Sequence, residues 1–194
     1  ESGKLPREHH GILHVGHAAY HTRVFANLYR LHGDQEALAL TEDDIKLIQI
    51  AALFHDAARV NDDKDDTDHE SGLLLYFYLL ELGVSPEKAK LLAEAVANKD
   101  VVDNKYKELK IEKDQFVWVE TIRTKKNIYQ KLIHDADCVD IIRARDKFEA
   151  RYLDFFLDVA INNDIAFNEL AWVIVEARSV IHIQGDSRLN IKHK

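Results

Sequence analysis

The chain has little proline, glycine and cysteine. Two prolines and seven glycines in 194 residues leave few positions that interrupt a helix, and alanine, leucine, glutamate, lysine and isoleucine are abundant. The single cysteine, Cys138, excludes an internal disulfide, so the fold must hold together in a reducing compartment as easily as elsewhere. We therefore predict an all-α protein whose composition fits the cytosol.

Long hydrophobic runs and an excess of positive charge are also absent. The longest apolar stretches, such as residues 73–80, are far shorter than a membrane span, and the first residues lack the apolar core of a signal peptide. With 26 Lys and Arg against 34 Asp and Glu, the net charge of −8 argues against a broad nucleic-acid footprint. We expect no membrane and no nucleic acid as partners, while a local cationic pocket for one phosphate stays compatible with this charge.

What is present is the composition of a folded protein. The chain is 46% hydrophobic and 31% charged, and its length suffices to bury a core without disulfides or metals as staples. We predict a single domain over residues 1–194, compact and built of several helices. Because the sequence starts with Glu1, we expect it to be excised from a longer protein.

Helix signals divide the chain into segments. Thr41 precedes a run of acids and then an apolar stretch, and Ser85 precedes Pro86, which are both N-terminal capping patterns. Gly33 and Gly83 are placed to end helices. We predict helices at 8–31, 41–58, 67–83, 85–99, 115–136, 137–160 and 163–183, with a surface excursion over residues 98–114.

Four histidines share one face of the first predicted helix. His10, His14, His17 and His21 are spaced by 4, 3 and 4 residues, which places them within about 60° of one another. A neutral imidazole keeps one donor and one acceptor that must be satisfied when it is buried. The stripe therefore indicates a site, the alternative being a face in solvent.

A wider set of residues could bind a metal ion. The adjacent pair His55 and Asp56 ends a helix that is apolar almost all round. With His14 or His17 before it and Asp137 after it in the sequence, the pair resembles the signature of HD-type phosphohydrolases. That resemblance implies an all-helical fold like that of cyclic-nucleotide phosphodiesterases and a divalent metal that activates water. The alternative for the pair is a helix end with a surface acid.

Five short strings carry a second resemblance: HGILH at 10–14, LFHDAAR at 53–59, HES at 69–71, ANKD at 97–100 and LIHDADCVDIIR at 132–143. Together they resemble the phosphodiesterase domain of SidE-type bacterial effectors. The resemblance implies an enzyme that cleaves ADP-ribose carried by ubiquitin, releases AMP and attaches phosphoribosyl-ubiquitin to a substrate serine, or that hydrolyses that link. It also implies a secreted effector acting in the host cell cytosol.

The resemblance assigns three catalytic roles and needs no cofactor. His10 matches the nucleophile that takes up the phosphoryl group, Glu70 the carboxylate that orients it, and His134 the acid and base. Imidazoles are competent in both roles near neutral pH. For Glu70 the alternative is a capping box with Thr67. Seven further residues are expected to bind substrate: His14, His17, His55, Asp56, Arg59, Asn98 and Asp137.

One position departs from the family pattern and keeps other functions open. His17 stands where the family more usually carries an arginine, so His17 itself, Arg23, Arg59 or Arg123 must supply that charge. Two alternatives follow from the residues. One is a nucleotide phosphohydrolase with a divalent metal on His17, His55, Asp56 and Asp137, or with His14 in place of His17. The other is a domain that binds AMP-like ligands without turnover.

Overall fold

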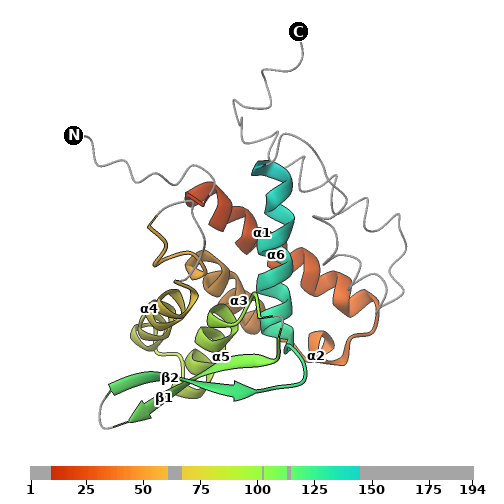
Figure 1. Ribbon diagram of the computed structural model, residues 1–194. Helices are drawn as coiled ribbons and strands as arrows, with labels where there is room; N and C mark the ends of the chain where they lie inside the picture. The colour runs from red at the N-terminus through yellow and green to blue at the C-terminus, as the bar shows by residue number, and fades with distance from the viewer. Residues whose placement is uncertain (1–9, 61–66, 102, 113–114, 145–194) are drawn as a thin grey trace, which may run out of the picture.

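The computed structural model describes residues 10–60, 67–101, 103–112 and 115–144. This part is mostly helical and carries one pair of strands (Figure 1). The elements in chain order are α1 (Ile12–Leu31), α2 (Gln35–Leu38), α3 (Glu42–Phe54), α4 (Asp68–Glu81), α5 (Pro86–Ala97), β1 (Lys105–Glu112), β2 (Gln115–Ile122) and α6 (Ile128–Ala144).

Local signals set several helix ends, as predicted. At the start of α3, the Asp44 N–H donates to Thr41 Oγ1 at 3.1 Å and the Thr41 N–H donates to Asp44 Oδ2 at 2.9 Å, which is a capping box. Ser85 caps α5, with Pro86 at its first position. Gly33, with φ of 79°, follows the end of α1 in the left-handed region that glycine tolerates. These boundaries are confirmed.

The start of α1 differs from the prediction. Within the described residues the helix begins at Ile12 with Gly11 as its N-cap, whereas the start predicted at residue 8 lies outside them. His10 therefore precedes the helix and does not belong to its histidine face. The position of its side chain is therefore not set by the helix, but by its contacts with other residues.

The described residues are mostly helical, which is roughly consistent with the all-α prediction, but they include an antiparallel hairpin. β1 pairs with β2 so that Lys105 lies opposite Ile122 and Glu112 opposite Gln115. The second strand, QFVWVETI, is rich in β-branched and aromatic side chains, which favour strands. The helix predicted over 115–136 is thus wrong up to residue 122, and the excursion at 98–114 contains β1. The last helix runs unbroken through residues 136 and 137, where the sequence predicts a boundary.

The core forms around α1, which packs against α3 and α6, while α4 packs against α5. In Figure 1, α6 crosses α1 and the hairpin lies at the edge of the molecule. Phe25, Ile48 and Leu132 are completely buried, and each such side chain stabilises the fold by about 2 kcal/mol. A Cβ on Gly72 would lie 2.6 Å from the carbonyl oxygen of Ala93, so glycine permits the close approach of α4 and α5.

The last two predicted helices fall largely beyond the described residues. Residues 145–160 and 163–183 lie outside them, so those predictions stay predictions. Among the helices that are described, none has the length and apolar character to cross a bilayer.

Candidate active site

The histidine face of α1 is turned into the protein. His14, His17 and His21 are only 4%, 4% and 2% exposed, while the side chain of His10, which precedes the helix, is 26% exposed. The face packs against α6 and the end of α3. The stripe is therefore an interior polar surface and not a face in solvent.

Asp140 of α6 binds two histidines of this face. Its Oδ2 lies 2.7 Å from Nδ1 of His14, and its Oδ1 lies 3.0 Å from Nδ1 of His17. Because a carboxylate only accepts, each Nδ1 carries the proton and donates it. Sequence reasoning missed Asp140, although it follows Asp137 by three residues and so shares its helix face.

His14 and His55 point their Nε2 atoms at each other across 3.0 Å. The Nδ1–H of His55 donates to the carbonyl oxygen of Ala52 at 2.6 Å, and that of His14 donates to Asp140. In the neutral rings both Nε2 atoms therefore carry lone pairs. Two lone pairs at this distance repel one another unless a proton or a cation lies between them.

Two carboxylates complete this cluster. Oδ1 of Asp137 lies 3.1 Å from Nε2 of His14 and 3.4 Å from Nε2 of His55, and Oδ2 of Asp56 lies 3.5 and 3.6 Å from the same atoms. Burial lowers the pKa of His14, but hydrogen bonds and charge from Asp137 and Asp140 outweigh it and raise the pKa to about 9. Without a metal, His14 is therefore a positively charged imidazolium, with a proton on both nitrogens, at neutral pH.

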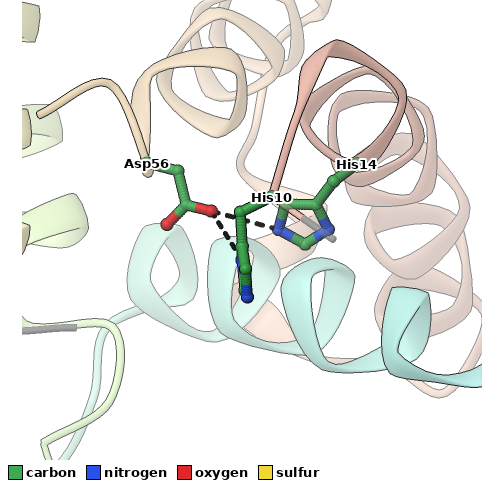
Figure 2. Close-up of side chains that lie close together, drawn as sticks. All are labelled: His10, His14 and Asp56. Carbon is green, nitrogen blue, oxygen red and sulfur yellow. Dashed lines mark hydrogen bonds and ion pairs between the residues drawn. The ribbon is translucent and has the colours of Figure 1, made fainter. Parts of the chain in front are cut away.

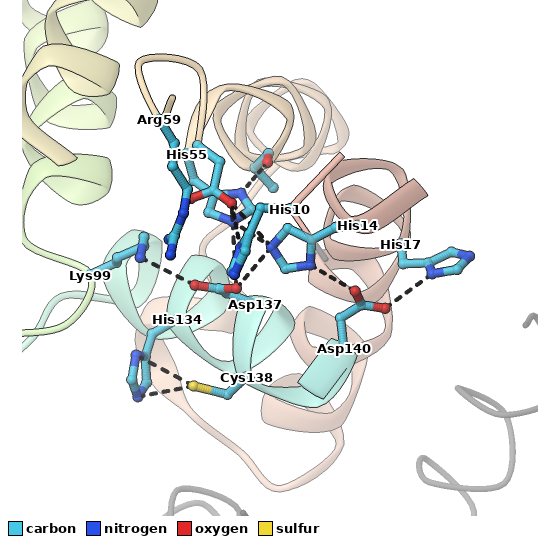
Figure 3. Close-up of polar contacts among 12 residues, drawn as sticks. His10, His14, His17, His55, Arg59, Lys99, His134, Asp137, Cys138 and Asp140 are labelled. Atoms are coloured by element: carbon cyan, nitrogen blue, oxygen red, sulfur yellow. Dashed lines mark hydrogen bonds and ion pairs between the residues drawn. The ribbon is translucent and has the colours of Figure 1, made fainter. Parts of the chain in front are cut away.

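Side chains of this cluster fit a divalent metal ion. Ligand atoms about 2.0–2.2 Å from a tetrahedral metal lie about 3.3–3.6 Å apart, close to the separations just given. Acceptors behind both Nδ1 atoms are also what metal-bound imidazoles need. Two overlapping groups of three could hold the ion, which are His14, His55 and Asp137, and His10, His14 and Asp56. The set with His17 is corrected, because His17 points away from His55 (Figure 3).

His10 and Asp56 form a dyad at the edge of the cluster (Figure 2). Nδ1 of His10 lies 2.9 Å from Oδ2 of Asp56, and Nη1 of Arg59 lies 3.6 Å from the other oxygen. Burial raises the pKa of Asp56, but the hydrogen bond from His10 and the charges of His55 and His14 hold it well below its usual range. Asp56 is thus an anion that fixes the proton on Nδ1 and leaves the lone pair of His10 on Nε2.

A second histidine–carboxylate pair lies on α6 and the turn after α5. Nδ1 of His134 lies 3.0 Å from Oδ1 of Asp100, and Sγ of Cys138 lies 3.8 Å from the same ring. The imidazole is partly exposed, with 22% of its side chain open to solvent. His134 is therefore oriented by a carboxylate and accessible, as an acid or base requires.

Lys99 connects the two parts of the site. Its ammonium group, with 3% of the side chain exposed, lies 3.2 Å from Oδ2 of Asp137, 2.6 Å from Oδ2 of Asp100 and 3.4 Å from Oδ1 of Asp68. Burial disfavours the charge, but these three carboxylates raise the pKa of Lys99 well above its ordinary value. A buried, charged lysine thus joins the His14 cluster to His134 (Figure 3). Sequence reasoning overlooked it inside the string ANKD.

The site brings together two carboxylate-backed imidazoles, an arginine and a buried lysine, which suits it to phosphoryl chemistry. A family model described as the SidE phosphodiesterase (PDE) domain matches residues 1–191. The chain belongs to this family. No curated protein and no solved structure matches it. The family supports a phosphodiesterase role for the chain, and it links the chain to the bacterial SidE effectors.

In this SidE phosphodiesterase domain, Glu70 does not contact His10. Glu70 is exposed on α4, and within the described part of the chain it has no hydrogen bond or ion pair. The side chain of Thr67 makes no capping bond either, so the alternative capping box lacks its first half. The carboxylate that orients His10 is Asp56, which the sequence assigns to substrate binding.

Asn98 has a structural role in this SidE phosphodiesterase domain, in place of the substrate contact predicted for it. The residue is fully buried, and its amide group donates to the carbonyl oxygens of Glu94 at 2.6 Å and Lys107 at 2.8 Å. Its own oxygen accepts the N–H of Lys107. Asn98 thereby ties the end of α5 to β1 and fixes the backbone next to Lys99.

His21 should make the stability of the SidE phosphodiesterase domain sensitive to acid. The ring is buried without a hydrogen-bond partner among the described residues, and burial lowers its pKa from 6.5 to about 4. The unfolded chain therefore binds a proton between these pH values that the folded chain does not, which costs up to about 3 kcal/mol by pH 4. We expect His21→Leu to gain stability over the unsubstituted protein as pH falls from 7 to 4.5.

Urea unfolding of the two proteins at pH 7, 5.5 and 4.5 measures this gain. His32→Leu, at the C-cap of α1, serves as the control for loss of a histidine outside the buried face. A difference between His21→Leu and the unsubstituted protein that does not change with pH would contradict the prediction.

Proposed function

We propose that this domain is a phosphodiesterase acting on ubiquitin that carries ADP-ribose or phosphoribose, with His10 as nucleophile and His134 as acid and base. The observation that carries the proposal is a carboxylate at Nδ1 of each imidazole, Asp56 at 2.9 Å from His10 and Asp100 at 3.0 Å from His134. Such a carboxylate fixes the tautomer, leaves Nε2 to react and stabilises the imidazolium that forms.

In the first step, Nε2 of His10 attacks the phosphorus atom attached to the ribose that carries ubiquitin. The P–O bond to the adenylate breaks, and protonated His134 donates its proton to the departing oxygen, so that AMP leaves. The phosphoribosyl-ubiquitin is then held by a P–N bond to His10. We assign to Arg59 and Lys99, which lie beside Asp56 and Asp137, the positive charge that would stabilise the phosphoryl oxygens.

In the second step, a serine hydroxyl of the substrate protein, or water, attacks the same phosphorus atom. Neutral His134 takes the proton of the incoming hydroxyl, and the P–N bond breaks to regenerate His10. The product is phosphoribosyl-ubiquitin linked to serine, or free phosphoribosyl-ubiquitin. Every proton moves between named groups of the chain and its substrates, so this route requires no metal.

The proposed partners follow from the family and the charge. Ubiquitin has basic patches, and a chain with a net charge of −8 attracts them over a long range. A member of an effector family that modifies ubiquitin would act where ubiquitin is found, which is the cytosol of the host cell.

The test is AMP release from ADP-ribosylated ubiquitin, measured with and without EDTA. We expect release to survive chelation and to fall by about 100-fold or more in His134→Ala, because the loss of a general acid or base costs that much. Cys138→Ala is the matched control, since it removes a sulfur 3.8 Å from the ring but keeps the imidazole and Asp100. Full activity of His134→Ala would overturn the assigned role.

A second candidate is a metal-dependent phosphohydrolase. It is favoured by the opposed Nε2 atoms of His14 and His55 at 3.0 Å with two carboxylates around them. A divalent ion there would supply a Lewis acid and an activated water. Loss of AMP release in EDTA, with recovery on adding Mn²⁺ or Zn²⁺, would favour it. AMP binding without release would favour a non-catalytic nucleotide-binding domain, which the histidine at position 17 motivates.

A further inference from the structure

Ser71 ties helix α4 to the turn that follows α3. Its side chain is completely buried, and its Oγ accepts the N–H of Ala58 at 3.0 Å. The two residues are 13 positions apart in the chain, so this bond joins two elements and does not belong to the hydrogen bonding of α4 itself. Neither step of the proposed reaction gives Ser71 a role.

The turn that Ser71 holds carries two residues of the site. Inside the turn, the carbonyl oxygen of Asp56 accepts the N–H of Arg59 at 3.1 Å, while the N–H of Ala58 donates to Ser71 instead. Ser71 therefore fixes the backbone between the carboxylate that orients His10 and the guanidinium group beside that carboxylate (Figure 2).

Helix α4 is a firm support for this bond. Next to Ser71, Gly72 lets α4 approach α5 so closely that an added Cβ would lie 2.6 Å from the carbonyl oxygen of Ala93. Two turns further along, Tyr78 packs on Phe54 of α3, with ring centroids 4.8 Å apart. Because α4 is packed closely against both neighbours, the core sets the position of the Ser71 hydroxyl.

We propose that Ser71 is a positioning residue of the active site, which acts through the backbone of Ala58 to keep Asp56 at Nδ1 of His10. The inference rests on the proposed function and deepens it, because it names a residue on which the orientation of the nucleophile depends. A displacement of about 1 Å at a reacting group can cost about 100-fold in rate, so a bond that fixes this turn has a measurable effect.

The test compares Ser71→Ala with Ser71→Cys. Because alanine leaves the N–H of Ala58 without its acceptor, we expect kcat for AMP release from ADP-ribosylated ubiquitin to fall about tenfold, with KM changed by less than about twofold. Cysteine has nearly the shape of serine but accepts more weakly, so the kcat of Ser71→Cys should lie between the other two. Amide hydrogen exchange at Ala58, measured without substrate, should be about tenfold faster in Ser71→Ala.

Ser85→Ala is the matched control. It removes the same type of bond far along the chain, because the Oγ of Ser85 accepts the N–H of Lys88 at 3.3 Å at the start of α5. We expect this variant to lower the unfolding midpoint, as the loss of a helix cap does, but to leave kcat and the exchange at Ala58 unchanged.

The outcomes separate this inference from the function on which it rests. An unchanged kcat in Ser71→Ala overturns it, and so does an equal loss in Ser85→Ala, because lower stability would then explain both. Unchanged exchange at Ala58 overturns the tie between α4 and the turn, whatever the activity. Failure of the unsubstituted protein to release AMP overturns the proposed function, while the exchange at Ala58 still tests the tie by itself.

Discussion

His10→Ala is expected to lower AMP release from ADP-ribosylated ubiquitin by at least about 1,000-fold, because it removes the proposed nucleophile, whose Nδ1 lies 2.9 Å from Oδ2 of Asp56. Folding should be preserved, since His10 precedes α1 and is partly exposed. Initial rates of AMP formation, together with the unfolding midpoint of each protein, measure the effect.

His32→Ala supplies the matched control for this loss. It removes a histidine at the far end of α1 that does not line the site, and its activity should equal that of the unsubstituted protein. If His10→Ala keeps more than a tenth of the activity while His14→Ala loses it, the nucleophile assignment is wrong. The cluster around His14 would then be the reacting centre.

Asp137→Asn is expected to reduce the free energy of unfolding by about 3 kcal/mol and to reduce AMP release as well. The change keeps the shape but removes the charge that faces Lys99 at 3.2 Å and the rings of His14 and His55. Leaving a buried ammonium group with one partner fewer costs about this much. Urea unfolding near neutral pH measures the stability.

The control for Asp137→Asn is Asp43→Asn. Asp43 pairs with Lys46 at 2.8 Å, but both side chains are exposed, so the pair contributes little and the unfolding midpoint should barely move. Equal midpoints for both variants would contradict the picture of Lys99 as a buried charge held by carboxylates. Metal content measured on the same samples reports on the second candidate, which requires Asp137 as a ligand.

The elements that could be predicted are those whose ends depend on interactions between residues close together in the sequence. Thr41, Ser85 and Gly33 set helix ends through bonds and dihedrals within a few residues, so their patterns suffice. The histidine face of α1 was likewise readable from helical spacing. The hairpin was not, because KYKELKIE is too charged to read as a strand, and β1 is held by pairing with β2 and by Asn98.

The parts of the site that could not be predicted depend on contacts between distant segments. Lys99 is buried because carboxylates from α4, α6 and its own turn converge on it. The same reason explains why the sequence predicts Glu70 as the partner of His10 while the structure has Asp56. Both acids belong to motifs that the sequence shows, but only the packing of α3 against α1 brings Asp56 to His10. Spacing identifies which residue types are available, but not which of them meet.

The covalent intermediate tests the central claim most directly. The unsubstituted protein and His134→Ala, in which both proposed steps are slowed, are mixed with ADP-ribosylated ubiquitin and quenched at alkaline pH, where phosphohistidine survives. Peptide mass spectrometry then locates the adduct. The account predicts phosphoribosyl-ubiquitin on His10, formed equally with and without EDTA. AMP release with no adduct on His10, stopped by EDTA, would contradict it.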